Sequence, residues 1–322
     1  MRVASALFAA VAMALALGSS VSAAEKFPNK AITIIVPFAA GGSTDLSARA
    51  LGDAVSKILG QPVTVENKPG GSGAIAIASL LRAPADGHTL LIMGSTQIAN
   101  QFMNDVPYDV TKDIAPVAHL TAYNAGLVVK SDAPWKSFKE FLDHVKAKPN
   151  SVSYGSSAAG TPQHLIIEKL SAEQGLKMKF VPFGGGVKAI TAVLGGHIEA
   201  ASQVTEWKPH VESGDLRLLV TYGTKRMPQF PDVPTLTDLG YNTSYLGFNS
   251  IVARSGAPAE AVKALGEAIK VTLADPNSEF NKLMQRYDLV TDFKGPEEFE
   301  VFLKQFIQDT KSMIELSGLA KK

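Results

Sequence analysis

The stretch ITIIVPFAAGGSTD, residues 32–45, decides the fold of this chain. Its opening residues are apolar or β-branched and stop at Pro37, a pattern that predicts a short buried strand of a parallel sheet. The Gly-Gly pair allows a sharp turn and a close backbone approach, and Ser43 or Thr44 can cap a following helix. Because the first N–H groups of a helix lack internal partners, this turn favours a bound anion.

A plain strand–turn–helix connection is the alternative interpretation of the same stretch. It contains no Lys or Arg before Arg49, so an anion would meet backbone N–H groups, hydroxyls and water. Asp45 would repel an anion, but it lies four residues before Arg49, which is the favourable order for an ion pair on a helix. We therefore expect Arg49 to neutralise Asp45.

Residues 1–24 have the layout of a secretory signal peptide. Arg2 precedes an apolar run from Ala6 to Leu17, and small residues follow at 22–24. The run is too short to span a bilayer, and the chain has no cysteine that could carry a lipid anchor. We expect an exported protein with no lipid anchor and no transmembrane segment, whose mature chain begins near Ala24.

The charge and the cysteine content narrow the classes of partner. The precursor has a formal charge of +1, and Arg2 is the charge that the signal peptide removes, which leaves 1 − 1 = 0. This balance argues against nucleic acid or an anionic membrane surface as the main partner. Without cysteines there are no disulfides, so the core must hold the chain together. A length of 322 residues suggests about two domains.

Strands and helices alternate in the first part of the chain. Strands are predicted over 63–67 and 89–93, with a small-residue helix between them. This order indicates a doubly wound α/β lobe, in which ligands bind beyond the carboxyl ends of the strands. A polar turn is the alternative interpretation of residues 95–97. The candidate ligand-binding residues on this rim are Phe38, Gly42, Ser43, Thr44, Asp45, Ser95 and Thr96.

A second strand–loop–helix unit begins at residue 151. Residues 151–154, SVSY, predict a strand, and GSSAAGTPQH, residues 155–164, predicts a small-residue loop that enters a helix. Thr161 is a good N-cap and Pro162 a good first helical residue. Two such units, far apart in the sequence, suggest two α/β lobes that face each other across a cleft.

The remaining pattern assigns the other strands to these lobes. Further strands are predicted over 178–183, 198–203, 216–222 and 247–253. Ser202 and Gln203 lie at the end of the strand predicted over 198–203. The last of these is expected to return the chain to the first lobe. We expect residues 25–122 and 242–322 to form the first lobe and residues 123–241 to form the second.

The residues do not form a familiar catalytic pattern. Ser157 lacks the glycine two positions later that a hydrolase nucleophile elbow needs. His164 and Glu168 are spaced to share a metal, but no second histidine accompanies them. Trp207 could cover a ligand or pack locally. Since no cluster of titratable groups falls in the glycine loops, we expect ligand binding without catalysis, cofactor or metal.

Ordered motifs of the chain resemble those of the Bug-type solute receptors of tripartite tricarboxylate transporters. VPFAAGGSTDLSAR, residues 36–49, is similar to the family signature V-P-[FY]-x-x-G-G-x-x-D-x-x-A-R. Further similar motifs are VENKPGG (65–71), GSSAAGTPQHL (155–165), VPFGG (181–185), LGG (194–196) and VPTL (233–236). The resemblance covers nearly all of the expected mature chain.

This resemblance implies a type II-like periplasmic binding protein whose two lobes close on a small organic carboxylate. In the family, one carboxylate is held between the two helix-start loops, partly through water. The residues carried over are Phe38, Ser43, Thr44 and Asp45 in the first lobe and Ser156, Ser157, Gly160, Thr161 and His164 in the second. The candidate set is completed by Gly42, Phe183 and Gly185 of the similar motifs and by Ser202 and Gln203.

The resemblance also implies partners and a compartment. The protein would act in the periplasm as a monomer and deliver its ligand to a large and a small membrane transporter subunit. Some amino-acid receptors of the family carry an acid after the strand predicted at 198–203, which pairs with the ligand ammonium. Ser202 and Gln203 are neutral here, with Glu206 a little beyond. We therefore hypothesise a carboxylate without an essential ammonium, which tight binding of aspartate but not of dicarboxylates would contradict.

A competing hypothesis from another class is sensing. The closed receptor would then dock onto a signalling partner instead of feeding a permease. Neighbouring genes for transporter subunits or for a histidine kinase would distinguish the two. An enzyme would have to turn over a candidate ligand, and recovery of unchanged ligand would count against it.

Overall fold

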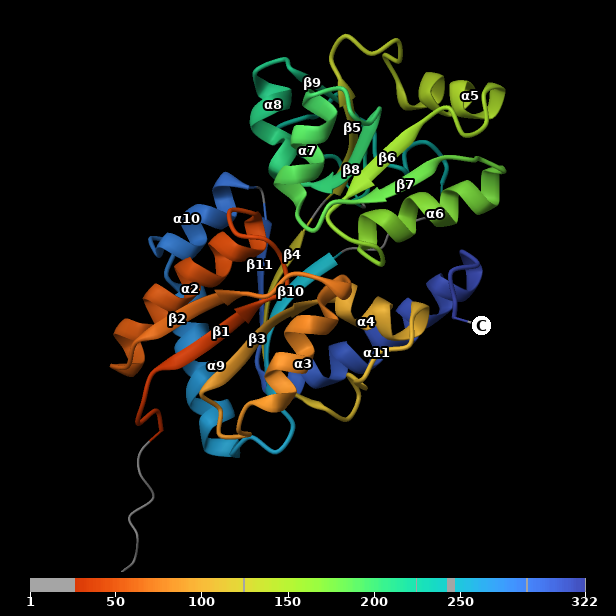
Figure 1. Ribbon diagram of the computed structural model, residues 1–322. Helices are drawn as coiled ribbons and strands as arrows, with labels where there is room; N and C mark the ends of the chain where they lie inside the picture. Colours follow the sequence, from red (N-terminus) through yellow and green to blue (C-terminus); the bar gives the residue numbers. More distant parts are fainter. Residues whose placement is uncertain (1–26, 124, 224, 242–246, 288, 322) are drawn as a thin grey trace, which may run out of the picture.

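The computed structural model describes residues 27–123, 125–223, 225–241, 247–287 and 289–321. The expected signal peptide, residues 1–24, lies outside the described residues. Figure 1 shows two lobes, each with a central sheet that is covered by helices. The prediction of a two-lobed α/β fold is therefore confirmed.

A six-stranded sheet forms the first lobe, in the order β11-β4-β10-β3-β1-β2. β1 pairs in parallel with β2 and with β3, whereas β10 runs antiparallel to both β3 and β4. The strands are β1 (Ile32–Val36), β2 (Val63–Asn67), β3 (Thr89–Gly94), β4 (Ile114–Tyr123), β10 (Gly247–Arg254) and β11 (Leu289–Lys294). The expected return of the chain through residues 247–253 is confirmed by β10.

Helices cover both faces of this sheet (Figure 1). One face packs on α2 (Ser43–Leu59), α9 (Ala259–Ala274) and α10 (Glu279–Arg286). The other face packs on α3 (Ala74–Arg82), which follows the short 3-10 helix η1 (Gly71–Gly73), on α4 (Ser95–Met103) and on α11 (Pro296–Leu316). The aromatic stripe of α11 is buried at Phe299 and Phe306, and burial of each such side chain stabilises the fold by about 1.5–3 kcal/mol.

A five-stranded sheet forms the second lobe, in the order β7-β6-β8-β5-β9. Its strands are β5 (Ala125–Lys130), β6 (Ser153–Ser156), β7 (Lys179–Pro182), β8 (Ala200–Val204) and β9 (Leu216–Thr221). α5 (Phe138–Ala147) and α6 (Pro162–Gln174) cover one face, and α7 (Gly186–Leu194), η2 (Thr205–Trp207) and α8 (Lys208–Glu212) lie on the other. The β6–α6 unit repeats the β1–α2 unit of the first lobe, as the sequence predicts.

Two elements differ from the sequence expectation. Residues 95–97, which the sequence left open between a ligand-binding loop and a polar turn, form the first turn of α4, where Gln97 Oε1 accepts a hydrogen bond from the Gly94 N–H at 2.9 Å. β4 was not predicted because Pro116 interrupts its apolar run. Proline cannot donate to a strand ladder, and the pairing of β4 with β10 shifts register beside this residue.

Candidate ligand-binding site

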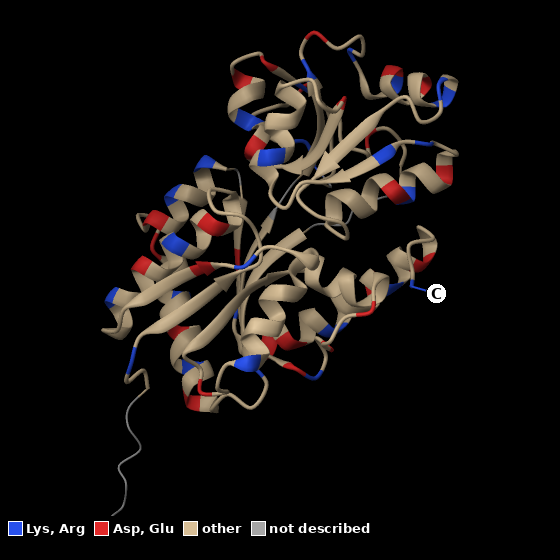
Figure 2. Cartoon of the chain, in the orientation of Figure 1, with Lys and Arg blue, Asp and Glu red and all other residues tan. Residues whose placement is uncertain are grey.

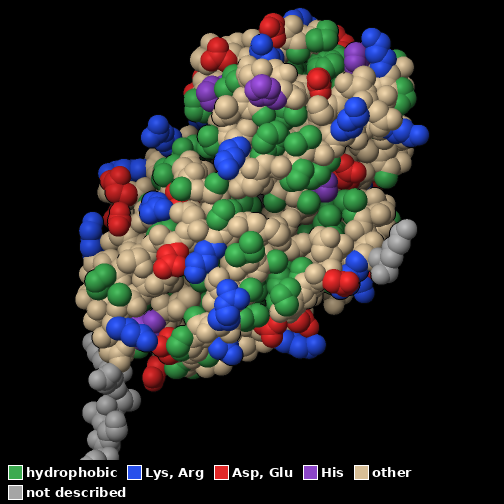
Figure 3. Space-filling model, in the orientation of Figure 1, with side chains coloured by type: hydrophobic (Ala, Val, Ile, Leu, Met, Phe, Trp, Pro, Cys, Tyr) green, Lys and Arg blue, Asp and Glu red, His purple; other side chains and the backbone are tan. Residues whose placement is uncertain are grey.

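A cavity of about 290 Å³ lies between the two lobes. Figure 2 shows few charged residues in the region where the two lobes meet. Figure 3 shows charged side chains scattered over the surface of both lobes on this face. The residues that line the cavity are Phe38, Ala39, Ala40, Gly42, Ser43, Thr44, Thr96, Ser157, Thr161, Gln163, Gly185, Gly186, Val187, Lys188, Gln203, Val204, Glu206, Asn249 and Leu289. Both lobes therefore build the site.

The starts of α2, α4, α6 and α7 all contribute to this lining. Ser43 and Thr96 lie in the first turns of α2 and α4, Thr161 is the N-cap of α6, and Gly185 is the N-cap of α7. The first N–H groups of a helix have no partner in the helical backbone, and a helix start carries roughly half a positive charge. Helix starts from both lobes thus surround one cavity, an arrangement that favours a small anion.

The loop that precedes α2 in the first lobe is held in place by hydrogen bonds to the side chain of Asp45, which is 2% exposed. Its Oδ2 accepts hydrogen bonds from the Gly41 N–H at 2.9 Å and from Arg49 Nε at 3.2 Å, while Oδ1 accepts from Asn67 Nδ2 at 2.9 Å. Burial acts to raise the pKa of Asp45, but these donors outweigh it and hold the pKa below its ordinary value. The expected pairing with Arg49 is confirmed, and Asp45 shapes the loop without lining the cavity.

The second-lobe loop is held in a similar way by the cap of α6. The Thr161 hydroxyl accepts a hydrogen bond from the His164 N–H at 3.3 Å and lies 3.0 Å from the Ser156 hydroxyl. His164 Nδ1 accepts from the Gly160 N–H at 3.1 Å. Burial lowers the pKa of His164 to about 4, so the ring is neutral at physiological pH and can accept this bond.

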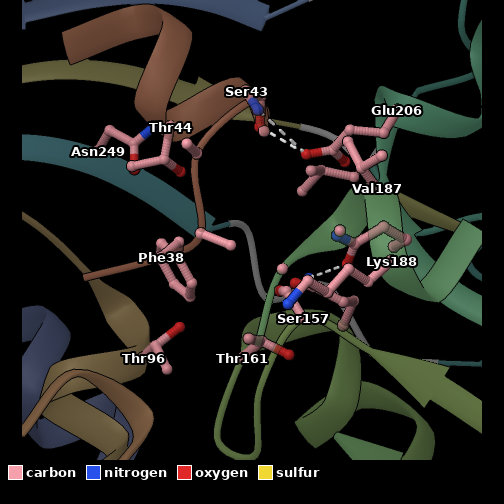
Figure 4. Close-up of a pocket in the computed structure, with 18 of the residues that line it drawn as sticks. Phe38, Ser43, Thr44, Thr96, Ser157, Thr161, Val187, Lys188, Glu206 and Asn249 are labelled. Atoms are coloured by element: carbon pink, nitrogen blue, oxygen red, sulfur yellow. Dashed lines mark hydrogen bonds between the residues drawn. The ribbon is translucent and has the colours of Figure 1, made fainter. Parts of the chain in front are cut away.

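Gln203 and Glu206 bring polar groups from the end of β8 and from η2. Gln203 Oε1 accepts a hydrogen bond from Gln163 Nε2 at 2.8 Å. Glu206 Oε1 accepts from the Ser43 hydroxyl at 2.8 Å and from the Ser43 N–H at 3.3 Å, which joins the two lobes (Figure 4). Burial raises the pKa of Glu206, and the hydrogen bonds from Ser43 act against this rise.

The predicted residues fall into two groups. Those that line the cavity are Phe38, Gly42, Ser43, Thr44, Thr96, Ser157, Thr161, Gly185 and Gln203. Those that lie outside its lining are Asp45, Ser95, Ser156, Gly160, His164, Phe183 and Ser202. Several of the second group hold residues of the lining in place: the Ser202 hydroxyl, for example, donates to the carbonyl of Gln163, which lines the cavity, at 2.8 Å.

Sequence reasoning missed part of the lining. The residues that it did not name as site residues are Ala39, Ala40, Gln163, Gly186, Val187, Lys188, Val204, Glu206, Asn249 and Leu289. The glycine run before α7 was a signal for Gly186 and its neighbours. No local pattern marks Asn249 or Leu289, because β10 and β11 return from the end of the chain. Glu206 also brings an acid into the cavity just after β8, where the sequence analysis expected the neutral side chains of Ser202 and Gln203.

Two alternatives left open by the sequence concern residues outside the lining. Trp207 is buried, packs on Phe230 and donates from Nε1 to the Gln203 carbonyl at 2.9 Å, so it packs locally. His164 Nε2 lies 3.9 Å from Glu168 Oε1. Among the described residues, no group of three or more His, Cys, Asp or Glu side chains could hold a metal ion.

The fold and the site define the class of two-lobed solute-binding proteins, with the ligand cavity between the lobes. A model of the Tripartite tricarboxylate transporter family receptor matches residues 47–319, and the chain belongs to this family. Within the described part of the chain, no helix has both the length and the apolar character needed to cross a membrane.

Individual relatives support this assignment. The chain is 35% identical to the "UPF0065 protein in gbd 5'region" of Cupriavidus necator over 313 residues, which are 97% of this chain and 95% of the relative. The solved structure of the periplasmic binding protein BugD is 26% identical, with a TM-score of 0.85 over 92% of this chain and all of that one. R. palustris Rpa4515 with adipate is 25% identical, with a TM-score of 0.85 over 91% of this chain and 99% of that one.

Proposed function

We propose that this protein is the periplasmic receptor of a tripartite tricarboxylate-type transporter and captures a small organic carboxylate between its lobes. Residues 25–122 and 242–322 would move as one lobe and residues 123–241 as the other. The receptor would act as a monomer and pass its ligand to a large and a small membrane subunit.

The convergence of α2, α4, α6 and α7 on one cavity carries this proposal. A carboxylate there would receive hydrogen bonds from the helix starts and from the hydroxyls of Thr44, Ser157 and Thr161. Because these donors come from both lobes, they are available to one ligand only when the lobes are close together. A bound carboxylate would therefore stabilise the closed arrangement. The relative with adipate supports the choice of ligand class.

A thermal-shift screen of the mature protein tests this proposal. The protein is first freed of co-purified ligand by unfolding and refolding, and then mixed with mono-, di- and tricarboxylates and with amino acids. A ligand that binds only the native state raises the midpoint by mass action. We expect a carboxylate to raise it and an uncharged amide of the same skeleton to have no effect.

Two matched variants test whether the ligand that raises the unfolding midpoint binds in the cavity between the lobes. Thr161→Ala and Ser137→Ala each remove a side chain that caps a helix, in α6 and α5 respectively. Both should lose about 0.5–2 kcal/mol of stability. Only Thr161→Ala should also weaken carboxylate binding, because Ser137 lies outside the cavity lining. Equal ligand-induced shifts in the two variants, or no shift with any carboxylate, would contradict the proposal.

A further inference from the structure

Glu206 places the protein's own carboxylate at a helix start that favours anions. Its Oε1 accepts both the N–H and the hydroxyl of Ser43, in the first turn of α2. Figure 4 shows the two side chains in direct contact at one side of the pocket, joined by these hydrogen bonds. In this structure, Glu206 thus occupies the place at α2 that a ligand carboxylate would otherwise take.

The space around Glu206 is built for this side chain. A Cβ on Gly186 would lie 2.8 Å from the carboxyl group of Glu206 and 1.9 Å from Gln203 Nε2. Glu206 is 8% exposed, and its Oε2 is buried with no hydrogen-bond partner among the described residues. A buried carboxylate with an unpaired oxygen is costly while it is charged.

The charged groups on the neighbouring elements leave this carboxylate largely uncompensated. On α2, Asp45 and Arg49 pair with each other at 2.9 Å. On α8, Lys208 lies 3.9 Å from Glu212. Lys188, in the first turn of α7, lines the cavity but is an exposed residue, so solvent screens its charge. An anionic ligand that reaches the start of α2 therefore lies beside the buried carboxylate of Glu206.

Two carboxylates that share one desolvated site do not both stay ionised. A ligand with a single carboxylate can use the helix starts of α4, α6 and α7 and leave Glu206 on Ser43. A dicarboxylate whose second carboxylate also reaches the start of α2 has to displace Glu206 or bind together with a proton. Either Glu206 or that second carboxylate then holds the proton.

We propose that Glu206 selects the charge of the ligand. At neutral pH the pocket prefers a monocarboxylate whose other end is uncharged and polar, and it takes the dicarboxylate of the same shape only with uptake of a proton. This inference rests on the proposed function and names the ligand class of the same cavity.

Matched ligand pairs provide the test. Succinate and adipate are each compared with their half-amides, which replace one carboxylate by an uncharged group of the same shape. Binding is measured by calorimetry in two buffers of different ionisation enthalpy, so that proton uptake is counted directly. We expect the half-amide to bind more tightly, and the affinity for the dicarboxylate to fall by about tenfold per pH unit above neutrality.

Glu206→Gln removes the charge and keeps an oxygen that can accept from Ser43. We expect this variant to bind the dicarboxylate about tenfold more tightly or better, with no proton uptake and little pH dependence. Glu260→Gln, which changes an exposed acid in the first turn of α9 outside the cavity lining, is the control and should behave as the unchanged protein. Thermal unfolding without ligand verifies that both variants fold.

The possible failures can be told apart. Dicarboxylate binding that is as tight as half-amide binding, without proton uptake, would overturn the role of Glu206 and leave the receptor function standing. Weaker dicarboxylate binding in Glu206→Gln would do the same, because Glu206 would then be assisting the dianion. Failure of every carboxylate to bind would overturn the receptor function and this inference with it.

Discussion

His164 Nδ1 accepts a hydrogen bond from the Gly160 N–H at 3.1 Å, and this bond fixes the second-lobe loop where it meets the first lobe. Gly160 has a φ of +77°, and a Cβ there would lie 3.2 Å from Ala99 Cβ and from Met103 Sδ, both on α4. The loop is thus in close contact with the opposite lobe. His164, outside the cavity lining, acts as a positioning residue for the residues that follow Gly160.

Replacing His164 should separate its hydrogen bond from its packing. His164→Asn offers an oxygen near the position of Nδ1, whereas His164→Leu leaves the buried Gly160 N–H without an acceptor. We expect His164→Leu to lose about 1–3 kcal/mol of unfolding free energy relative to His164→Asn. Denaturant unfolding at pH 7 measures this difference. His197→Asn, at an exposed histidine, is the control, and equal stabilities of the two His164 variants would contradict the role of the bond.

The lowered pKa of His164 also predicts a pH dependence. The folded protein has a pKa of about 4 at this ring, against an ordinary value of 6.5. Between these values the unfolded chain binds a proton that the folded protein does not, so stability falls as the pH falls. We expect His164 to account for a loss of about 3 kcal/mol across this window. His164→Asn should show a shallower decline from pH 7 to 4 than the unchanged protein, and identical slopes would contradict the prediction.

Asp45→Asn tests the acid that holds the first-lobe loop. The amide can accept one of the hydrogen bonds from Gly41, Arg49 and Asn67 but adds two donors at a buried position. We expect a loss of about 1–3 kcal/mol in unfolding free energy at pH 7, measured by denaturant unfolding. Asp53→Asn, at an exposed position of the same helix, should change stability little.

The effect of Asp45→Asn should also depend on pH with a definite sign. Because the folded pKa of Asp45 lies below the ordinary value of 3.8, its ionised form stabilises the fold above that value. The contribution is lost as the pH falls through the folded pKa. The stability difference between Asp45→Asn and the unchanged protein should therefore shrink below about pH 4. A difference that grows in acid would show that the carboxylate is not the stabilising form.

The helix starts of the site could be predicted because their signals are local. The Gly-Gly-Ser-Thr run before α2 and the Gly-Thr-Pro run before α6 specify a turn and a cap within a few residues. Each start follows the carboxyl end of a strand in its own lobe, β1 or β6, and the two lobes face each other with these ends toward the cavity. Ser43, Thr44, Ser157 and Thr161 were found in this way, and all line the cavity.

The other lining residues depend on contacts between distant parts of the chain. Asn249 enters because β10 inserts between β3 and β4, and Leu289 enters through β11. Glu206 reaches the cavity only because η2 follows β8 and faces α2 across the cleft. In the sequence alone, Glu206 is an acid three residues after the strand end, with nothing to indicate that Ser43 is its partner.

Gly186 illustrates how tightly these distant contacts are packed. A Cβ there would lie 1.9 Å from Gln203 Nε2 and 2.8 Å from Glu206 Oε1, so Gly186→Ala must displace both side chains from the cavity wall. We expect ligand affinity to fall by about tenfold or more, because a cavity wall shifted by an ångström misplaces the donors that hold the ligand. Gly42→Ala, whose added Cβ meets nothing closer than 3.9 Å, should lose clearly less affinity. Calorimetric titration with one carboxylate compares the affinities of the two variants. An equal loss in both would show that the clash of the added Cβ with Gln203 and Glu206 is not the cause of the loss in Gly186→Ala.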